Sequence, residues 1–382
     1  MTDLILRGGR VIDPSQGIDK LADVGFTAGK VSAVSANLAS GPGTRVRDVT
    51  GLIVTPGLID LHTHVYWGGT SLGVDAVEVA RRSGATTCVD AGSAGPGNFH
   101  GFRRHVIEPS PVRILPFLNL SFPGIYAFSA TVMVGECADL RLLDLHECRR
   151  VAEENRDLVV GIKVRVGHGA SGTSGIAPLD MALEVAEEMG LPVMAHLDDP
   201  PPTRREVLTR LRKGDVLTHC FRPFPNAPYS PGGGVREEVL EARGRGVLFD
   251  IGHGGGSFGF GTTRAMLGAG FLPDCISSDV HCLSIDGPAF DLIVTMSKFL
   301  CLGMELPAIV RAATAAPASA IRCPNLGTLK IGNPGDATVI AIEDGEFIYH
   351  DVTGEMMPGN RRLVSRGIVI NGTWWHPNAA NA

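Results

Sequence analysis

The chain has 382 residues, of which 44% are hydrophobic and 19% charged, as is typical of a globular protein with a large core. Its net charge is −6 without any basic stripe, which argues against nucleic acid and anionic membranes as partners, and no apolar stretch is long enough to span a bilayer. The eight cysteines are scattered without a CxxC pair, and the start of the chain lacks signal-peptide features, so we expect a cytoplasmic protein without disulfides.

The first segment of the chain, about 55 residues long, predicts short strands separated by Gly- and Asp-containing turns. The last segment, of about the same length, shows the same pattern of short apolar pieces. Neither segment alone has enough strands for a stable sheet. We therefore expect residues 1–55 and 327–382 to combine into one small β-sandwich domain.

The middle of the chain, residues 56–326, alternates apolar β-branched runs with amphipathic helical segments. The eight apolar runs lie near residues 57–61, 85–90, 113–120, 159–166, 192–196, 215–219, 246–251 and 275–279. This α/β pattern predicts a (β/α)8 TIM-like barrel. A doubly wound open sheet is the rival, but it usually carries a Gly-rich phosphate turn after its first strand, and none is found there.

Several side chains able to bind metal fall at the carboxyl ends of these predicted strands, where barrel enzymes place their active residues. They are His62, His64, Lys163, His196, His219 and Asp279. Taken singly, each has an ordinary structural explanation, since a lone strand histidine is more often a hydrogen-bonded core residue than a ligand. Together they would be a costly set of buried polar groups, which favours a shared function.

The sequence resembles the amidohydrolase superfamily through the whole chain. The run Thr55-Pro56-Gly57-Leu58-Ile59-Asp60 before the HxH pair is similar to that superfamily's first barrel strand. The single lysine, the two later histidines and the final aspartate also match its binuclear-metal branch. Four segments resemble the bacterial deacetylases often called dihydroorotase-like, namely residues 89–95, 161–165, 214–221 and 276–281.

The resemblance implies two divalent metal ions, expected to be Zn²⁺. His62, His64 and Asp279 would bind one ion, and His196 and His219 the other. Lys163 would bridge them as a carbamate formed with CO2, since a desolvated lysine has a lowered pKa and its neutral amine can react. The metal pair would activate a bridging hydroxide to attack a carbonyl, and Asp279 would act as the catalytic base and acid.

Four further residues are candidates for substrate binding. Arg165 shares a strand face with Lys163, so its guanidinium suits a substrate carboxylate, although a salt bridge to a nearby acid explains it equally well. His281, His253 and Tyr66 lie close enough to strand ends to contact substrate or merely to hold loops. The Pro- and Gly-rich stretch at residues 222–234 is typical of an active-site loop or lid.

We predict a deacetylase-like hydrolase of an acyl amide or ester whose small-molecule substrate also carries a carboxylate, such as an N-acetyl amino acid or an O-acetyl 2-hydroxy acid. The alternative is a cyclic amidase of the dihydroorotase or hydantoinase kind. Tyr66 and Trp67 stand where dihydroorotases have an arginine after the HxH pair, which argues against that enzyme. A third possibility is a binding scaffold that has lost the metal-binding side chains, but this is disfavoured because all six candidate metal ligands are present. We also expect a homo-oligomer.

Overall fold

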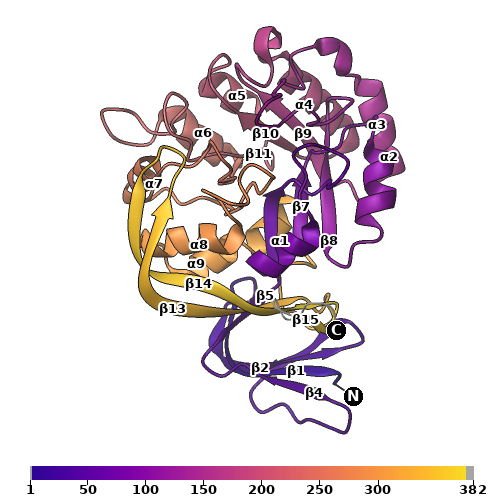
Figure 1. Ribbon diagram of the computed structural model, residues 1–382, viewed down its shortest axis with the longest axis vertical. Coiled ribbons are helices and arrows are strands. Elements are labelled where there is room, and N and C mark those ends of the chain that lie inside the picture. The colour runs from indigo at the N-terminus through magenta and orange to yellow at the C-terminus, as the bar shows by residue number, and fades with distance from the viewer. Residues whose placement is uncertain (1, 376–382) are drawn as a thin grey trace.

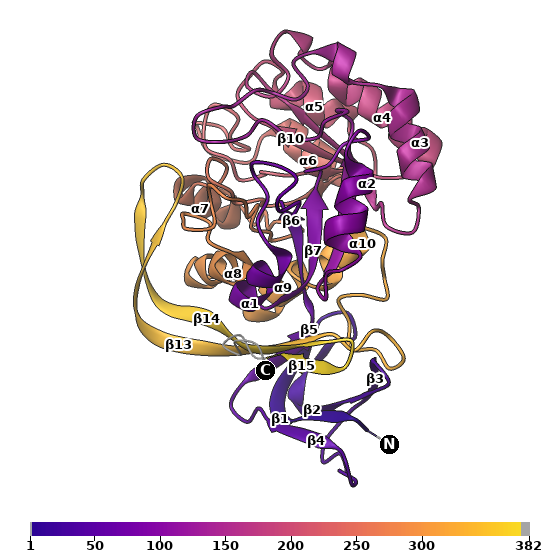
Figure 2. The same ribbon diagram turned by 45° about the vertical axis from the view of Figure 1, so that its right-hand side comes forward.

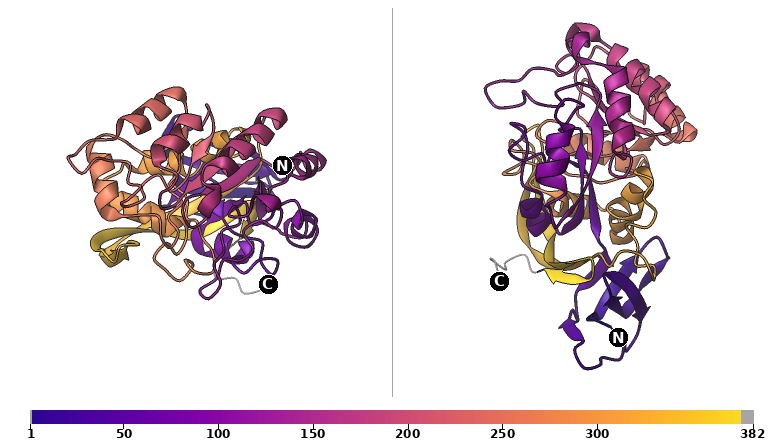
Figure 3. Two further views of the ribbon diagram at one scale, coloured as in Figure 1. Left: turned by 90° about the horizontal axis from the view of Figure 1, so that it is seen from above. Right: turned by 90° about the vertical axis from the view of Figure 1, so that its right-hand side faces the viewer.

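The computed structural model describes residues 2–375, and these contain two β-sheets (Figure 1). Residue 1 and residues 376–382, which belong to the predicted terminal domain, lie outside the described range. One sheet combines strands from both ends of the chain, and the other is a parallel sheet from the middle. The strands from the start of the chain lie at one end of the long axis of the molecule, next to the parallel sheet in its middle (Figure 3, right).

The terminal sheet has eight strands in the order β15-β14-β13-β5-β1-β2-β3, with β4 paired to β1. Its strands are β1 (Leu4–Asp13), β2 (Ile18–Thr27), β3 (Lys30–Ser35), β4 (Arg45–Asp48), β5 (Ile53–Pro56), β13 (Ala337–His350), β14 (Met356–Ile370) and β15 (Thr373–Trp375). The antiparallel pairing of β5 with β13 joins the two ends of the chain. Alternate residues of these strands, such as Val54, Val339 and Val369, bury an apolar core that belongs to this sheet alone.

Strands β13 and β14 form a hairpin much longer than the short pieces expected from the sequence, with 14 and 15 residues respectively. Two register shifts interrupt the pairing of its strands. Beyond the terminal sheet, the hairpin bends along the side of the molecule and runs past helix α8 (Leu292–Cys301) towards α7 (Phe260–Gly268) (Figure 2). The terminal segment of the chain thereby reaches the flank of the parallel sheet.

The parallel sheet has seven strands in the order β12-β11-β10-β9-β8-β7-β6. They are β6 (Leu58–Thr63), β7 (Ala85–Ala91), β8 (Arg113–Asn119), β9 (Gly161–Val166), β10 (Val193–Leu197), β11 (Val216–Leu217) and β12 (Leu248–Phe249). Strand β7 is buried along its whole length, as expected of a parallel strand with both faces covered. Each strand begins close to its predicted position, although β11 and β12 are only two residues long.

Helices follow most of the parallel strands and pack on the outside of the sheet (Figure 3, left). Besides α7 and α8 they are α1 (Ala76–Ser83), α2 (Phe99–Phe102), the π-helical turn η1 (Arg103–Ile107), the 3-10 turns η2 (Leu140–Leu142) and η3 (Gly172–Ser174), α3 (Leu145–Glu154), α4 (Ala177–Met189), α5 (Arg204–Arg210), α6 (Glu237–Arg245), α9 (Leu306–Ala312) and α10 (Ala315–Ala320). Local sequence sets their ends. In α1, the side chain of Asp75 caps the first turn, and Gly84 ends the helix in a left-handed conformation.

The predicted eighth strand, near residues 275–279, forms bridges to both edges of the parallel sheet without being a regular strand. Cys275 bridges Asp250, just beyond β12, and Val280 bridges Thr63 of β6. The backbone N–H of Asp279 donates to the carbonyl of His62 at 2.7 Å. Asp279 itself has a left-handed backbone with φ of 49°, which interrupts the extended conformation. This segment brings the two edges of the curled sheet together.

Within residues 2–375, the structure contains no helix that combines the length and the apolar character needed to cross a membrane.

Candidate metal centre

The six predicted ligands lie together in one pocket at the carboxyl ends of the parallel strands. The pocket is lined by His62, His64, Leu72, Ile125, Phe128, Lys163, Arg165, His196, His219, Asp279 and His281. Four histidines, a lysine and an aspartate therefore share one buried space, as the strand-end pattern predicted. Of the other lining residues only His281 carries a group able to bind metal, since the rest are apolar or, in Arg165, a guanidinium.

His62, His64 and Asp279 form the tightest group of potential ligand atoms. One ligand atom from each residue lies within 4.8 Å of the other two. The Nε2 atoms of His62 and His64 lie 3.3 and 3.2 Å from the same Asp279 oxygen, Oδ1. Imidazole nitrogen and carboxylate oxygen are ordinary zinc ligands, so the chemistry of this group fits a divalent cation.

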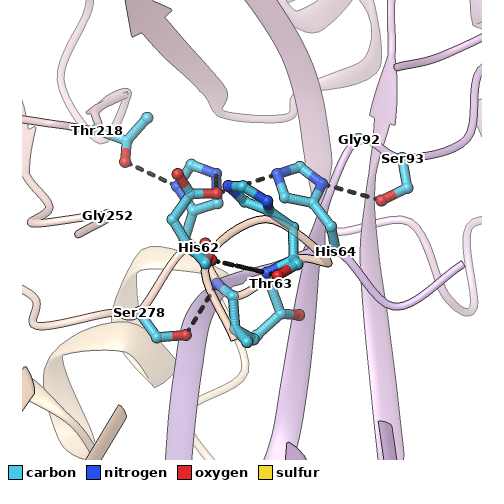
Figure 4. Close-up of polar contacts among 12 residues, drawn as sticks. His62, Thr63, His64, Gly92, Ser93, Thr218, Gly252 and Ser278 are labelled. Carbon is cyan, nitrogen blue, oxygen red and sulfur yellow. Dashed lines mark hydrogen bonds and ion pairs between the residues drawn. The ribbon is translucent and has the colours of Figure 1, made fainter. Parts of the chain in front are cut away.

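Hydrogen bonds on the outer side of two rings fix which nitrogen faces the pocket (Figure 4). His62 Nδ1 lies 2.8 Å from Thr218 Oγ1, and that hydroxyl donates its proton to Asp250 at 2.7 Å. The hydroxyl must therefore accept from His62 Nδ1–H. His219 Nδ1 lies 2.7 Å from the carbonyl of Gly252, which can only accept. Both rings thus carry their proton on Nδ1 and present a lone pair on Nε2, as metal-binding histidines do.

His64 has the same kind of support on its outer side. Its Nδ1 atom lies 2.9 Å from the hydroxyl of Ser93, whose own backbone N–H donates to Asp90 at 2.8 Å. The second oxygen of the Asp90 carboxylate accepts the backbone N–H of Val65. This buried aspartate therefore orders both the loop after β7 and the chain that follows His64.

His196 supplies an orphaned polar atom that points to a missing partner. Its Nε2 atom is buried and has no hydrogen-bond partner among the described residues. The ring packs edge-on against His219, with 4.5 Å between centroids. A buried polar atom without a partner is costly, so a cation between the two rings would satisfy a group that the protein leaves open.

Lys163 is fully buried on β9 and lines the same pocket as the four histidines. Its Nζ atom is 3.4 Å from Nε2 of His62. Burial lowers the pKa of Lys163 to about 7, so the neutral amine is well populated near neutral pH. An ammonium between two cations would be repelled, whereas a neutral amine is a nucleophile that can be modified.

Burial also governs the protonation of the histidines and of Asp279. It lowers the pKa of His62, His196 and His219 well below the usual value, and that of His64 to about 3. All four rings are therefore neutral at pH 7, the form that binds metal. Burial raises the pKa of Asp279 to about 6, which makes its carboxylate a better proton acceptor than a solvent-exposed aspartate.

The backbone around the pocket adopts left-handed conformations at positions that carry ligands. His219 has φ of 62° and Asp279 φ of 49°, both unusual for residues with a side chain. Gly92 has φ of 83°, and a Cβ atom there would lie 2.6 Å from Cβ and Cγ of Lys163. Only glycine lets the chain after β7 approach the lysine so closely. Such strain concentrates at functional sites, and here it surrounds the ligand atoms.

Arg165 lines the pocket and also forms a salt bridge with a nearby acid, which was the alternative explanation for this residue in the sequence analysis. Its Nη1 atom donates to Oε2 of Glu136 at 3.0 Å, and its guanidinium carbon lies 5.2 Å from the ring centroid of Phe128. The second oxygen of Glu136 is buried and has no partner in the described part of the chain. The pair leaves the other guanidinium N–H groups of Arg165 without a protein partner among the contacts found for residues 2–375.

The three other predicted contacts occupy different places. His281 lines the pocket, 6.1 Å from His64 between ring centroids. Tyr66 stacks on Phe102 at 4.6 Å and lines a separate surface cavity next to α1, outside the metal pocket. His253 is buried against Phe258 and also lies outside the pocket lining. The sequence placed all three near strand ends but could not give their side-chain directions.

The sequence interpretation missed the residues that support the ligands. They are Asp60, Asp90, Ser93, Thr218, Asp250, Ser277 and Ser278. Glu136, the partner of Arg165, and Arg222 were missed as well. A signal was available for the acids, because Asp60, Asp90 and Asp250 each stand in an apolar strand where an unpaired charge would be unfavourable. The guanidinium of Arg222, which donates to Ser257 at 3.0 Å, lies in the predicted lid stretch and carried no such signal.

Comparison with known proteins identifies the family of the chain. The sequence model of the amidohydrolase family matches residues 53–215, which contain four of the six candidate ligands. A deacetylase of Agrobacterium fabrum is 37% identical over 342 residues, which cover 90% of this chain and 83% of that protein. The chain therefore belongs to the amidohydrolase family, and it is a hydrolase that acts on C–N bonds. This confirms the family predicted from the sequence.

Two solved structures are similar along almost the whole chain. A structure described as a dihydroorotase is 34% identical with a TM-score of 0.89, covering 98% of this chain and 99% of the other. A structure described as an adenine deaminase is 29% identical with a TM-score of 0.91, covering 98% and 100%. The α/β fold is therefore of the TIM-barrel type. The two descriptions name different reactions, so the fold does not determine the substrate.

Proposed function

We propose that this protein is a binuclear metal-dependent deacetylase. His62, His64 and Asp279 would hold one divalent ion, and His196 and His219 the other, with Zn²⁺ as the expected metal. The observation that carries the proposal is the gathering of the four histidines, Lys163 and Asp279 in one pocket, with the Nε2 atom of His62 next to Lys163 and the Nε2 atom of His196 left without a partner among the described residues. Four neutral imidazoles and a carboxylate provide a donor set suited to zinc.

Lys163 would complete the site as a carbamate. Its neutral amine adds to CO2 and releases one proton, which leaves a negatively charged carboxylate group at the end of the side chain. This group has two oxygens and can therefore lie between two cations. The lowered pKa of Lys163 and the close approach allowed by Gly92 support this modification.

The residues of the pocket then divide the chemistry between them. When bound, the two cations would supply an activated water and polarise the carbonyl of the substrate. The Asp279 carboxylate accepts the proton of the attacking water and delivers it to the leaving nitrogen or oxygen. Arg165, held in orientation by Glu136, pairs with a carboxylate of the substrate. His281 lines the same pocket and would contact the substrate.

The proposed substrate class is a small acylated molecule with a carboxylate, such as an N-acetyl amino acid or an O-acetyl 2-hydroxy acid. The deacetylase of Agrobacterium fabrum and a deacetylase of Enterococcus faecalis, 30% identical over 92% of this chain, support the acyl group. The position of Arg165 in the pocket lining supports the carboxylate. A cyclic amidase is the second candidate, favoured by the similarity to the structure described as a dihydroorotase.

Metal analysis and a substrate panel test the proposal together. Purified protein should contain about two divalent ions per chain, and removal with a chelator should abolish hydrolysis until metal and bicarbonate are restored. The panel contains N-acetyl-D- and L-amino acids, acetylated hydroxy acids, dihydroorotate and a hydantoin. Hydrolysis of the cyclic substrates alone would favour the second candidate, and protein that binds no metal would refute the binuclear centre.

We also propose that the parallel sheet closes into a (β/α)8 barrel. The bridges from residues 275–280 to both sheet edges support this, with that segment taking the place of the eighth strand. In this proposal residues 56–326 form the barrel domain, and residues 1–55 with 327–382 form a β-sandwich domain. The protein would act on its small-molecule substrate as a cytoplasmic homo-oligomer.

A further inference from the structure

Lys298 is a buried lysine that the proposed chemistry does not use. It lies on α8, and its side chain is completely excluded from solvent. Three acceptors surround its Nζ atom, namely Nε2 of His253 at 2.7 Å and the carbonyls of Pro288 at 2.7 Å and His350 at 2.8 Å. An ammonium group has three N–H donors, so these three contacts satisfy it completely. Lys298 thus ties together three segments that are distant in sequence.

His253 connects Lys298 to the loop that follows β12. The charged form of Lys298 can only donate, so in this contact Nε2 of His253 accepts and the ring proton lies on Nδ1. Nδ1 in turn donates to the carbonyl of Gly254 at 2.9 Å. The ring stacks on Phe258 with 4.5 Å between centroids, which fixes its plane. The imidazole is therefore held from three sides and restrains the backbone at Gly254.

The two residues that flank His253 each contact a proposed metal ligand. The carbonyl of Gly252 accepts the hydrogen bond from His219 Nδ1 at 2.7 Å. Gly254 presses against Asp279, since a Cβ atom there would lie 2.2 Å from Asp279 Oδ2. Both glycines have left-handed backbones, with φ of 46° and 53°. Residues 252–254 therefore form a short loop that touches one ligand of each proposed ion, with its middle residue anchored by Lys298.

We propose that Lys298 and His253 are positioning residues that hold the loop at residues 252–254, and through it His219 and Asp279, in the geometry of the active site. This inference rests on the proposed function for its effect on catalysis, but its structural part does not. Displacement of a reacting group by about 1 Å can lower a rate about a hundredfold, so a small loop shift is sufficient. The contact of Lys298 with His350 also links the hairpin of the terminal sheet to this loop.

The test compares Lys298→Met with a matched control on the same helix. Ser297 is the neighbouring buried residue, and its hydroxyl accepts the backbone N–H of Leu363 in the hairpin without contacting residues 252–254. Ser297→Ala therefore loses a comparable buried contact. In the metal-free proteins, hydrogen exchange of the 253 and 254 amides should be at least fivefold faster in Lys298→Met than in the wild type and in Ser297→Ala.

Catalysis provides the second measurement, made on the metal-loaded proteins with the best substrate of the panel. Lys298→Met should lower kcat at least tenfold while KM changes less than threefold, and Ser297→Ala should stay within twofold of the wild type. His253→Gln is the variant that keeps an acceptor for Lys298, and it should reproduce the loss of kcat with little loss of stability. If Lys298→Met does not fold, His253→Gln replaces it in both the exchange and the kinetic measurements.

The outcomes separate this inference from the proposed function. Unchanged exchange at residues 253 and 254 would overturn the anchoring role, whatever the enzyme hydrolyses. Faster exchange with normal kcat in both variants would overturn the link to catalysis and leave the proposed function intact. A wild-type protein inactive on the whole panel would refute the proposed function, while the exchange experiment would still test the anchor.

Discussion

Asp279 is constrained at both its backbone and its side chain, and this makes its role testable by a small change. Its carboxylate lies 3.3 and 3.2 Å from the two ring nitrogens of His62 and His64. Asp279→Asn keeps an oxygen for a cation but removes the proton acceptor. We expect the variant to retain metal, measured by elemental analysis, and to lose at least a hundredfold in kcat. A variant with full turnover would exclude Asp279 from proton transfer.

Gly92 gives a second prediction at the scale of one residue. Gly92→Ala would push the loop after β7 away from Lys163, and we expect it to lower both metal content and the free energy of unfolding, the latter by roughly 1–3 kcal/mol. Gly190→Ala is the control, because Gly190 also has a left-handed backbone but no atom near its would-be Cβ. That variant should lose stability in chemical denaturation and keep its metal. Equal metal content in both variants would argue against a role of the close contact between Gly92 and Lys163 in metal binding.

Single residues also show what a sequence can and cannot reveal about a site. Strand periodicity and position at the strand end were sufficient to place His62, His64 and Lys163 in one pocket. The partners of these side chains were not predictable, because Thr218 and Asp250 meet only after β11 and β12 are side by side. His253 shows the same limit, since its side chain turns towards Lys298 on a helix 45 residues later in the chain.

The tip of the β13–β14 hairpin is attached to the start of helix α7. Asp351 is buried there, and its carboxylate accepts the backbone N–H groups of Phe260, Thr353 and Glu355 at 2.8 to 2.9 Å. Asp351→Ala would leave these donors unsatisfied, and we expect a loss of about 1–3 kcal/mol in the free energy of unfolding. Glu355→Ala, which removes the exposed ion pair with Arg264, should cost less than about 1 kcal/mol in the same denaturant titration. Equal losses would mean that the tip is not anchored through Asp351.

Elements rich in β-branched residues were predicted at nearly their observed positions, because buried parallel strands read as continuous apolar runs. The ends of β11 and β12 were predicted too late in the chain. These strands stop early because His219 and Gly252, which follow them, have left-handed backbone conformations at the pocket. The length of the hairpin was also missed. Polar residues around Glu343–Glu346 interrupt the apolar alternation, and the pairing continues past them only through a register shift.

Lys298 also gives the whole molecule a pH-dependent stability. Burial lowers the pKa of Lys298 to about 7, although the nearby carboxylates of Asp291 and Asp351 favour its charged form. Between pH 7 and the ordinary lysine pKa, the unfolded chain binds more protons than the folded one, so stability rises with pH. The free energy of unfolding of the wild type relative to Lys298→Met should increase from pH 7 to pH 9, at up to about 1.4 kcal/mol per pH unit.

Denaturant titrations of the two proteins at several pH values measure this difference. Lys163 titrates in both proteins, so its contribution cancels in the comparison when both are studied without metal. A difference that stays constant from pH 7 to pH 9 would show that Lys298 keeps the same charge in the folded and unfolded chains.

The alternating β and α pattern, with strand-rich ends, predicted the α/β fold with a parallel sheet in the middle of the chain and a second sheet shared by its two ends. The sequence could not show which strands of the two terminal segments pair with each other. Strand β5 pairs with β13, and the carbonyl of Thr338 lies within reach of the Thr55 hydroxyl across 283 residues of chain. No local pattern encodes such a pairing, because it depends on the folding of the parallel sheet that lies between the two segments in sequence.

The shared terminal sheet has a consequence for the order of events during synthesis. Strands β1 to β5 leave the ribosome before β13, so β5 gains its outer neighbour only after residue 337 has been made. At about 5–20 residues per second, that edge stays unpaired for roughly 15–60 seconds, long enough for contacts with other nascent chains. The polar and charged residues of Arg45–Asp48 in β4 lie along the same early sheet. The sheet that β1 to β5 begin is therefore completed only after β13 has been synthesised.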